Sequence, residues 1–97
     1  MKQTSLNDKF NNELKIGDLV LVAYTNNLII GIFAGVGQAN NLQYYALNKW
    51  HVNRVNDGKR LYKSYINTSY DCRFAKYSVD LLDAESKSYY EAILKAL

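Results

Sequence analysis

The sequence has no proline, one cysteine and one histidine, and no apolar run approaches the roughly 20 residues that a membrane-spanning helix needs. Cys72 has no second cysteine with which to form an internal disulfide, which is typical of a reducing compartment. The opening residues, MKQTSLNDKF, lack the apolar segment of a signal peptide. We therefore expect a protein that stays inside a cell, or on a particle assembled there, away from membranes.

The shortage of reactive side chains also argues against catalysis. A nucleophile needs an activating base, and Cys72, His51 and either Asp57 or Asp71 form a set that any chain with one Cys and one His would offer. A buried thiol in a strand and a surface histidine beside a turn are the simpler interpretation. Zinc needs more nitrogen and sulfur ligands than these two side chains supply. We predict no enzyme activity, no catalytic residue, no metal site and no cofactor.

Two other patterns have structural explanations. Asp80, Asp83 and Glu85 gather where a helix N-terminus favours negative charge, so capping explains them better than acid–base chemistry does. The glycine-rich stretch GIFAGVG, residues 31–37, follows a strand instead of opening a helix, and no Lys-Ser or Lys-Thr pair comes after it. It is therefore not expected to bind phosphate.

The composition is that of a folded domain with a biased set of codons. Hydrophobic residues make up 48% and charged residues 22% of the 97 residues, which predicts one domain spanning residues 1–97. Residue types with A/T-rich codons (Asn, Lys, Tyr, Ile and Phe) total 38, against 16 for Gly, Ala, Arg and Pro. We infer an AT-rich bacterial or phage genome, so the many asparagines need no functional explanation.

The clearest structural signal is a β-hairpin. Residues 19–25 and 28–34 are rich in Val, Leu and Ile and flank Asn26-Asn27, which tolerate the positive φ angles of a two-residue turn. Glycines at positions 31, 35 and 37 predict a bulge, a bend or a close approach of two backbones.

Two further strands are predicted, over residues 42–50 and 72–79. Tyr44 and Tyr45 are neighbours within the first of them. Successive side chains of a strand face opposite sides, so these two rings cannot both enter the same core.

A helix is expected at each end of the chain. Leu6, Phe10 and Leu14 are spaced four apart behind Ser5, which predicts a short helix over residues 5–14 despite its poorly helix-forming asparagines. Residues 83–97 begin at Asp83, a good N-cap, and contain no Gly or Pro. They predict a C-terminal helix with one apolar stripe, formed by Tyr89 or Tyr90, Ile93 and Leu97.

The stretch WHVNRVNDGKRLYKSY, residues 50–65, is predicted to be a projecting hairpin with Asp57-Gly58 as its turn. With a two-residue loop, one face would carry Trp50, Val52 and Arg54 with Leu61, Lys63 and Tyr65. With a three-residue loop, the first three would share a face with Arg60, Tyr62 and Ser64. Neither register gives the apolar side that a half-buried hairpin should have. We therefore expect the tip to extend beyond the barrel, either as a solvated tip with Trp50 and Tyr65 at its base joining the core, or as an arm suited to contact.

These elements predict a mainly β fold: about five antiparallel strands in a small barrel over residues 16–79, preceded by a segment over 1–15 and closed by the helix. KIGDLVLV, followed by a strand carrying glycines in IIGIFAGVG, resembles the opening hairpin of SH3-like barrels of the KOW and Tudor types. The resemblance covers roughly residues 15–50. The whole chain also looks like small proteins of tailed phages that infect AT-rich gut bacteria, which implies an accessory or host-directed role.

Charge and aromatic residues concentrate in the middle of the chain. Residues 49–76 carry seven cations against Asp57 and Asp71, whereas residues 77–97 carry two cations against four anions. Trp, Tyr and Arg concentrate binding energy at protein interfaces, and rings among cations also suit single-stranded nucleic acid. The candidate contact surface therefore consists of Trp50, Arg54, Lys59, Arg60, Tyr62, Lys63 and Tyr65.

Two functions fit this surface. The first is a non-catalytic protein-interaction or structural module, such as an accessory virion protein or an inhibitor that docks on a host protein. The second is a nucleic-acid-binding small barrel that uses Arg54, Lys59, Arg60 and Lys63. A sequence pI of about 9.0 and nine acidic residues give only a diluted positive field, which favours the protein partner. An open strand edge would also allow a homo-oligomer.

Overall fold

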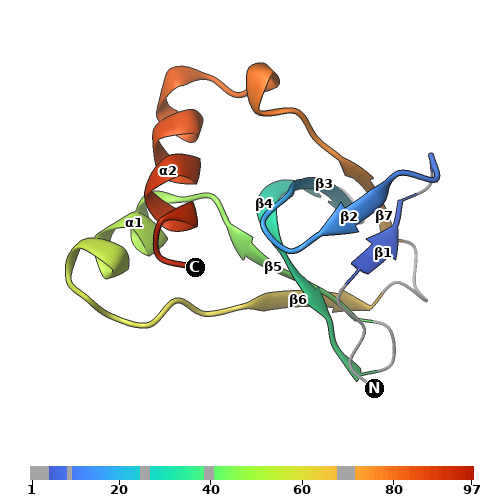
Figure 1. Cartoon of the computed structure of the whole chain (residues 1–97), viewed down its shortest axis with the longest axis horizontal. Helices are drawn as coiled ribbons and strands as arrows, with labels where there is room; N and C mark the ends of the chain where they lie inside the picture. The colour runs from blue at the N-terminus through green and yellow to red at the C-terminus, as the bar shows by residue number, and fades with distance from the viewer. Residues whose placement is uncertain (1–4, 9, 25–26, 39–40, 68–71) are drawn as a thin grey trace.

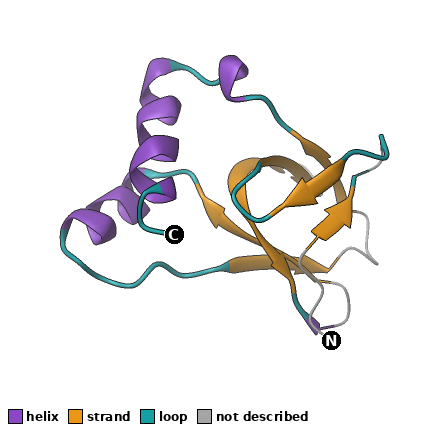
Figure 2. Cartoon of the chain, viewed as in Figure 1, coloured by secondary structure: helices purple, strands orange, loops and turns teal. Residues whose placement is uncertain are grey.

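The computed structural model describes residues 5–8, 10–24, 27–38, 41–67 and 72–97. The described chain is mainly β, with its helices gathered at one end and a small N-terminal hairpin at the other (Figures 1 and 2). The strands are β1 (Ser5–Asn7), β2 (Glu13–Lys15), β3 (Leu19–Tyr24), β4 (Asn27–Val36), β5 (Asn41–Ala46), β6 (Ser64–Asn67) and β7 (Cys72–Lys76). The helices are α1 (Lys49–Asn56), the 3₁₀ turn η2 (Val79–Leu81) and α2 (Ala84–Leu94).

Five strands form one antiparallel sheet in the order β6-β5-β4-β3-β7, and β1 and β2 form a separate two-stranded sheet. The long strand β4 is central and pairs with β3 on one side and β5 on the other. Strands β6 and β7 are the two edges. No pairing between these edges closes the sheet into a barrel within the described residues.

The predicted hairpin of β3 and β4 is confirmed. Tyr24 pairs with Asn27, so Asn27 belongs to β4 and its predicted place in the turn was wrong. Thr25 and Asn26 lie outside the described residues.

The glycines in and after β4 behave as predicted. The register between β4 and β5 shifts between Phe33 and Gly35, which marks a bulge, and Gly35 has a φ of +113° that side chains disfavour. At Gly31 the backbones approach so closely that a Cβ atom would lie 2.9 Å from the carbonyl oxygen of Tyr45.

The central sheet packs on both faces. One face, with the N-terminal hairpin, holds the hairpin-side cluster, which is made of Leu14, Val20, Val22, Phe33, Val36, Leu42 and Tyr44. The other face, under α2, holds the helix-side cluster of Leu19, Ile32 and Ile93, with Tyr45, Val52 and Tyr90 packed around them. Two clusters on opposite faces explain why β4 is buried at six consecutive positions, 31–36.

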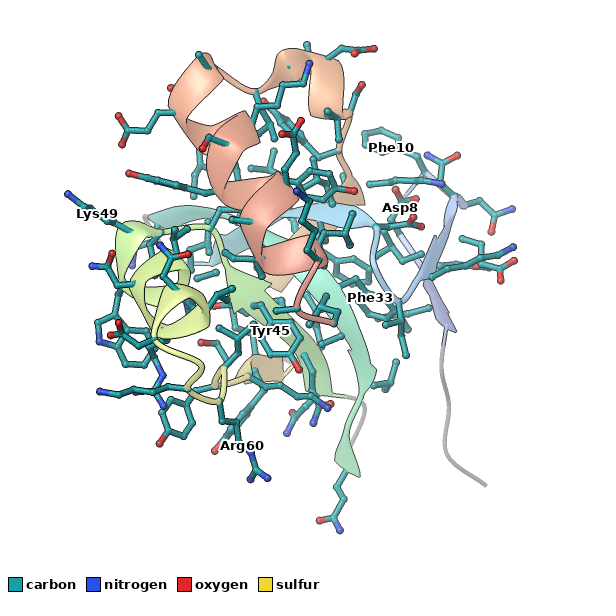
Figure 3. The ribbon with its side chains drawn as sticks, turned by 60° about the vertical axis from the view of Figure 1, so that its left-hand side comes forward. Asp8, Phe10, Phe33, Tyr45, Lys49 and Arg60 are labelled. Atoms are coloured by element: carbon teal, nitrogen blue, oxygen red, sulfur yellow. The ribbon has the colours of Figure 1, made fainter. Side chains whose placement is uncertain are left out.

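The two adjacent tyrosines separate as predicted. Tyr44 is buried in the hairpin-side cluster, whereas Tyr45 packs against the helix-side cluster, toward the helices (Figure 3). The strand that carries them, β5, ends at Ala46, so the predicted strand over 42–50 was too long. The strand predicted over 72–79 likewise ends at Lys76, and Tyr77 and Val79 leave the sheet to join the helix-side cluster.

The helix predicted over residues 5–14 was wrong, because these residues form the β1–β2 hairpin. Leu6 and Leu14 pair across it and face the hairpin-side cluster, while Phe10 is exposed at the turn. Asp8 explains the outcome. Its buried carboxylate accepts hydrogen bonds from the backbone N–H groups of Phe10 at 2.9 Å and Asn12 at 2.7 Å. Asp and Asn side chains that hydrogen-bond to nearby backbone groups in this way compete with helix formation.

The C-terminal helix is confirmed as α2. Its N-cap is Asp83, whose carboxylate accepts the backbone N–H of Ser86 at 2.7 Å, and this hydrogen bond lowers the pKa of Asp83. Tyr90 and Ile93 face the helix-side cluster, as the predicted stripe requires. The stripe stops there, because the helix ends at Leu94 and Leu97 is half-exposed.

The hairpin predicted over residues 50–65 was also wrong. Its first half is the helix α1, and only Ser64–Asn67 is a strand, β6, paired with β5. The Asp57-Gly58 pair ends the helix instead of turning a hairpin. The N–H of Gly58 donates to the carbonyl of Val55 at 3.0 Å and that of Lys59 donates to Arg54 at 2.8 Å, the two bonds of a Schellman motif.

Candidate functional site

The helix α1 places Trp50 and Arg54 one turn apart on the same helix face, and the segment after it returns Tyr62 to that face. The rings of Trp50 and Tyr62 stack, with centroids 5.9 Å apart and planes inclined by 28°. The guanidinium carbon of Arg54 lies 4.9 Å from the Trp50 centroid and 4.7 Å from the Tyr62 centroid. We call Trp50, Arg54 and Tyr62 the aromatic–arginine cluster.

Backbone hydrogen bonds hold the cluster in place. The Nε–H of Arg54 donates to the carbonyl oxygen of Arg60 at 2.6 Å, which fixes both the guanidinium and the segment that carries Tyr62. Nε2 of His51 lies 3.2 Å from the carbonyl oxygen of Tyr62. Nδ1 of His51 lies 2.9 Å from Oδ1 of Asn48. The imidazole therefore bridges the start of α1 to the chain that returns to β6.

The rings of the cluster stay in solvent although they are fixed. Trp50 is 50% exposed and Tyr62 is 56% exposed. Each cation–π contact and each ring pair contributes on the order of 0.5–1 kcal/mol, so the three contacts together favour this arrangement of the side chains in the free protein. An ordered surface of large exposed rings has little side-chain entropy left to lose on binding.

The structure gathers only part of the predicted contact surface. Of its seven residues, the cluster contains Trp50, Arg54 and Tyr62, and Arg60 joins it through its carbonyl oxygen. The Arg60 side chain points outward, away from the body of the protein (Figure 3). Tyr65 lies on the edge strand β6, is 67% exposed, and makes no ring contact with the cluster. Lys59 and Lys63 are exposed on the segment between α1 and β6.

No carboxylate of the described residues forms an ion pair with the cations around the cluster. Within the described residues the one ion pair joins Lys76 and Asp18, at 3.6 Å, outside this region. From residue 49 to residue 63 the chain has one carboxylate, Asp57, which is exposed at the C-terminus of α1. Five cations occupy the same stretch, namely Lys49, Arg54, Lys59, Arg60 and Lys63.

The sequence analysis did not identify His51 and Asn48, whose polar contacts connect the start of α1 to the segment that carries Tyr62. His51 was expected on the surface beside a turn, but it is only 4% exposed. Asn48 is the N-cap of α1, and its side-chain oxygen accepts the backbone N–H of His51 at 2.8 Å. The available signal was an asparagine three residues before a histidine, which is the spacing of an N-cap and its bonded N–H.

Other chemical features of the described chain are slight. No group of three or more His, Cys, Asp or Glu side chains gathers there as it would around a metal ion. A shallow hollow of about 70 Å³ lies on the sheet beside Leu21, Arg73 and Phe74, well below the several hundred Å³ of a typical ligand pocket. Asp71 and the side chain of Cys72, weighed above as catalytic candidates, lie outside the described residues.

Neither α1 nor α2 is long and apolar enough to cross a membrane, and the same holds for any other helix in the described ranges. Comparison of the chain with protein-family models, with curated proteins and with solved structures returned no match.

Proposed function

We propose that this protein is a non-catalytic protein-interaction module, and that the aromatic–arginine cluster is its contact surface. The observation that carries the proposal is the combination of exposure and order in Trp50 and Tyr62. At least half of each residue's surface is exposed to solvent, yet the two rings stack on each other and the Arg54 guanidinium contacts both. Trp, Tyr and Arg are the residue types in which interface binding energy concentrates.

The arrangement of the rings favours a protein partner over nucleic acid. Proteins that bind single strands offer open ring faces on which bases stack. Here Trp50 and Tyr62 stack on each other, and Arg54 lies over both. A net charge of +3 is also small for a domain dedicated to nucleic acid.

The proposal extends to the fold type and the origin of the chain. Numbered along the chain from β3 to β7, the sheet order is 5-1-2-3-4, with a bulged and bent second strand, which supports an SH3-like small barrel. The A/T-rich codon bias and the small size support a phage or mobile-element origin. An accessory virion protein or an inhibitor that docks on a host protein would both use such a module.

A peptide-display selection tests the contact surface. The wild-type protein is used to select binders from a library of short random peptides displayed on yeast, and the selected pool is then tested against two variants. Tyr62→Ala removes a cluster ring and should abolish binding of most selected peptides. Tyr65→Ala removes a tyrosine outside the cluster that is more exposed, at 67% against 56% for Tyr62, and should leave binding unchanged. A pool that does not distinguish the two variants would overturn the proposal.

Titration with fluorescent single- and double-stranded oligonucleotides tests the alternative function, nucleic-acid binding. We expect weak binding at about 50 mM salt and no binding at about 200 mM, since few phosphate contacts are available. Micromolar, salt-sensitive binding that is lost in the Arg54→Ala/Arg60→Ala variant would replace the protein-interaction proposal with the nucleic-acid one.

A further inference from the structure

We infer that the partner presents an acidic peptide segment, and that a carboxylate of this segment binds the outer edge of the Arg54 guanidinium. The inference rests on the proposed function and adds the chemistry of the partner to it. It follows from the hydrogen bonds of Arg54, from the charge around it, and from the position of the two rings.

The first step is the orientation of the guanidinium. An arginine side chain has five N–H donors, and the Nε–H of Arg54 is used by the carbonyl oxygen of Arg60. No other described residue accepts a hydrogen bond from this side chain. With Nε bonded to the Arg60 carbonyl oxygen and Cζ held 4.9 Å and 4.7 Å from the ring centroids of Trp50 and Tyr62, the two Nη groups remain as a paired donor edge. Such an edge matches the two oxygens of a carboxylate.

The second step is the charge that surrounds this donor edge. Lys49, Lys59, Arg60 and Lys63 are exposed, and none pairs with a carboxylate of the described chain. Lys49 extends outward from the start of α1, and Arg60 extends from the segment below it (Figure 3). Cations left without internal partners attract an acidic segment and repel a basic one.

The third step separates a peptide carboxylate from a nucleic-acid phosphate. A nucleotide that stacked its base here could use only the outer sides of the rings, because the facing sides of Trp50 and Tyr62 are taken by each other. The same outer surface is half-exposed and lies next to the Arg54 guanidinium. That surface suits an apolar side chain next to an acidic one, so we expect a partner segment in which Glu or Asp adjoins Leu or a similar residue.

The experiment uses Trp50 as its own reporter, since it is the sole tryptophan of the chain. Intrinsic fluorescence is titrated with a capped peptide of alternating Glu and Leu, with the matching Gln and Leu peptide, and with single-stranded oligothymidine. We expect the Glu peptide to bind at least about tenfold more tightly than the Gln peptide, a difference typical of a lost charge-assisted hydrogen bond.

Two variants test the role of the donor edge. Arg54→Lys keeps the charge and loses the paired donors, and it should weaken binding of the Glu peptide about tenfold. Arg73→Lys makes the same change on the exposed face of β7, outside the cluster, and should have no effect. Circular dichroism of both variants establishes that they are folded.

Each outcome bears on a different proposal. Equal binding of the Glu and Gln peptides, or equal binding of the Glu peptide to wild type and Arg54→Lys, would overturn the acidic-partner inference and leave the contact surface intact. Display-selected peptides that depend on Tyr62 but lack Asp and Glu would do the same. Tighter binding of the oligothymidine than of the Glu peptide would overturn both the inference and the proposed function.

Discussion

At Gly31 a single missing side chain sets the distance between two strands. A Cβ atom there would lie 2.8 Å from Cδ2 of Tyr44 and 2.9 Å from the backbone oxygen of Tyr45, so the sheet would have to open. We predict that Gly31→Ala lowers the free energy of unfolding by about 1–3 kcal/mol, the usual result of overpacking. Urea denaturation followed by circular dichroism measures the loss.

Gly37 provides the matched control for this substitution. The three atoms nearest to a Cβ atom there all belong to the Gln43 side chain, the closest being Nε2 at 2.7 Å, which is the far end of a flexible side chain that can turn away. Gly37→Ala should change the free energy of unfolding by no more than about 0.5 kcal/mol. Equal losses in the two variants would mean that the close approach at Gly31 does not limit the packing of β4 on β5.

Asp8 connects the N-terminal hairpin to the central sheet through one carboxylate. Besides the three hydrogen bonds it accepts within the turn, it accepts the backbone N–H of Lys76 in β7 at 2.8 Å. Burial raises the pKa of Asp8, but the backbone N–H donors from Lys76, Asn12 and Phe10 outweigh it, so the pKa is lowered. The folded chain therefore stabilises the ionised form of Asp8 relative to the protonated form.

This lowered pKa predicts the acid dependence of stability. Since the unfolded chain holds the proton more tightly, the contribution of Asp8 is complete above the ordinary carboxyl pKa of 3.8 and is lost as the pH falls below it. Asp8→Asn should lower the free energy of unfolding at neutral pH by about 2 kcal/mol, since bonds to a charged acceptor are lost. Below pH 3.8 the gap between wild type and variant should narrow. A constant gap between neutral pH and this acid range, measured by urea denaturation, would contradict the assigned role.

At the scale of elements, α1 shows how one sequence signal supports two structures. Asp-Gly is favoured in a hairpin turn because glycine accepts a positive φ, and Gly58, at φ +70°, uses the same property to end a helix. The absence of an apolar side in either hairpin register was interpreted as a sign of a projecting arm, whereas the segment is a helix. In the helix, His51 is buried and Val52 packs on the helix-side cluster, while the flanking Trp50 and Asn53 are exposed.

Two asparagine substitutions test the boundaries of α1. Asn48→Ala removes the N-cap and the oxygen that faces His51, so we expect a loss of about 1 kcal/mol in the free energy of unfolding. Asn53→Ala makes the same chemical change at an exposed position inside the helix, where alanine is the better helix former, and should raise it by about 0.5 kcal/mol. In a strand, alanine at position 53 would bring no gain, so thermal melts of the pair distinguish helix from hairpin.

The elements that could be predicted from the sequence are those whose signals are local and agree with each other. The β3–β4 hairpin has two apolar runs and a turn, and α2 has an N-cap followed by an uninterrupted helical period. The helix predicted over residues 5–14 was wrong because the spacing of Leu6 and Leu14 fits two structures. Eight positions apart, they pair across a hairpin as well as they would align along one face of a helix. The aromatic–arginine cluster could be predicted by residue type, but its geometry depends on His51 and on the carbonyl of Arg60, which no periodicity reveals.

At the scale of the whole molecule, β4 is the element that both packed faces share. Phe33 belongs to the hairpin-side cluster and its neighbour Ile32 to the helix-side cluster. The two clusters therefore cannot separate without disrupting the same strand. This arrangement favours the single domain expected from the sequence over two independently folding layers.

Ile93 in α2 tests this cooperativity, because it is fully buried in the helix-side cluster, with no exposed surface. Ile93→Ala should lower the free energy of unfolding by about 3 kcal/mol, and Leu97→Ala, at a half-exposed position beyond the helix, by less than about 1 kcal/mol. Two probes follow the transition: Trp50 fluorescence on the helix side, and the NMR methyl signals of Leu14 and Leu42 in the hairpin-side cluster. Because β4 couples the two faces, both probes should shift to the same lower denaturant midpoint in Ile93→Ala. A shift of the Trp50 transition alone would show that the layer of helices unfolds by itself, and the contact surface would then be a separable part of the protein.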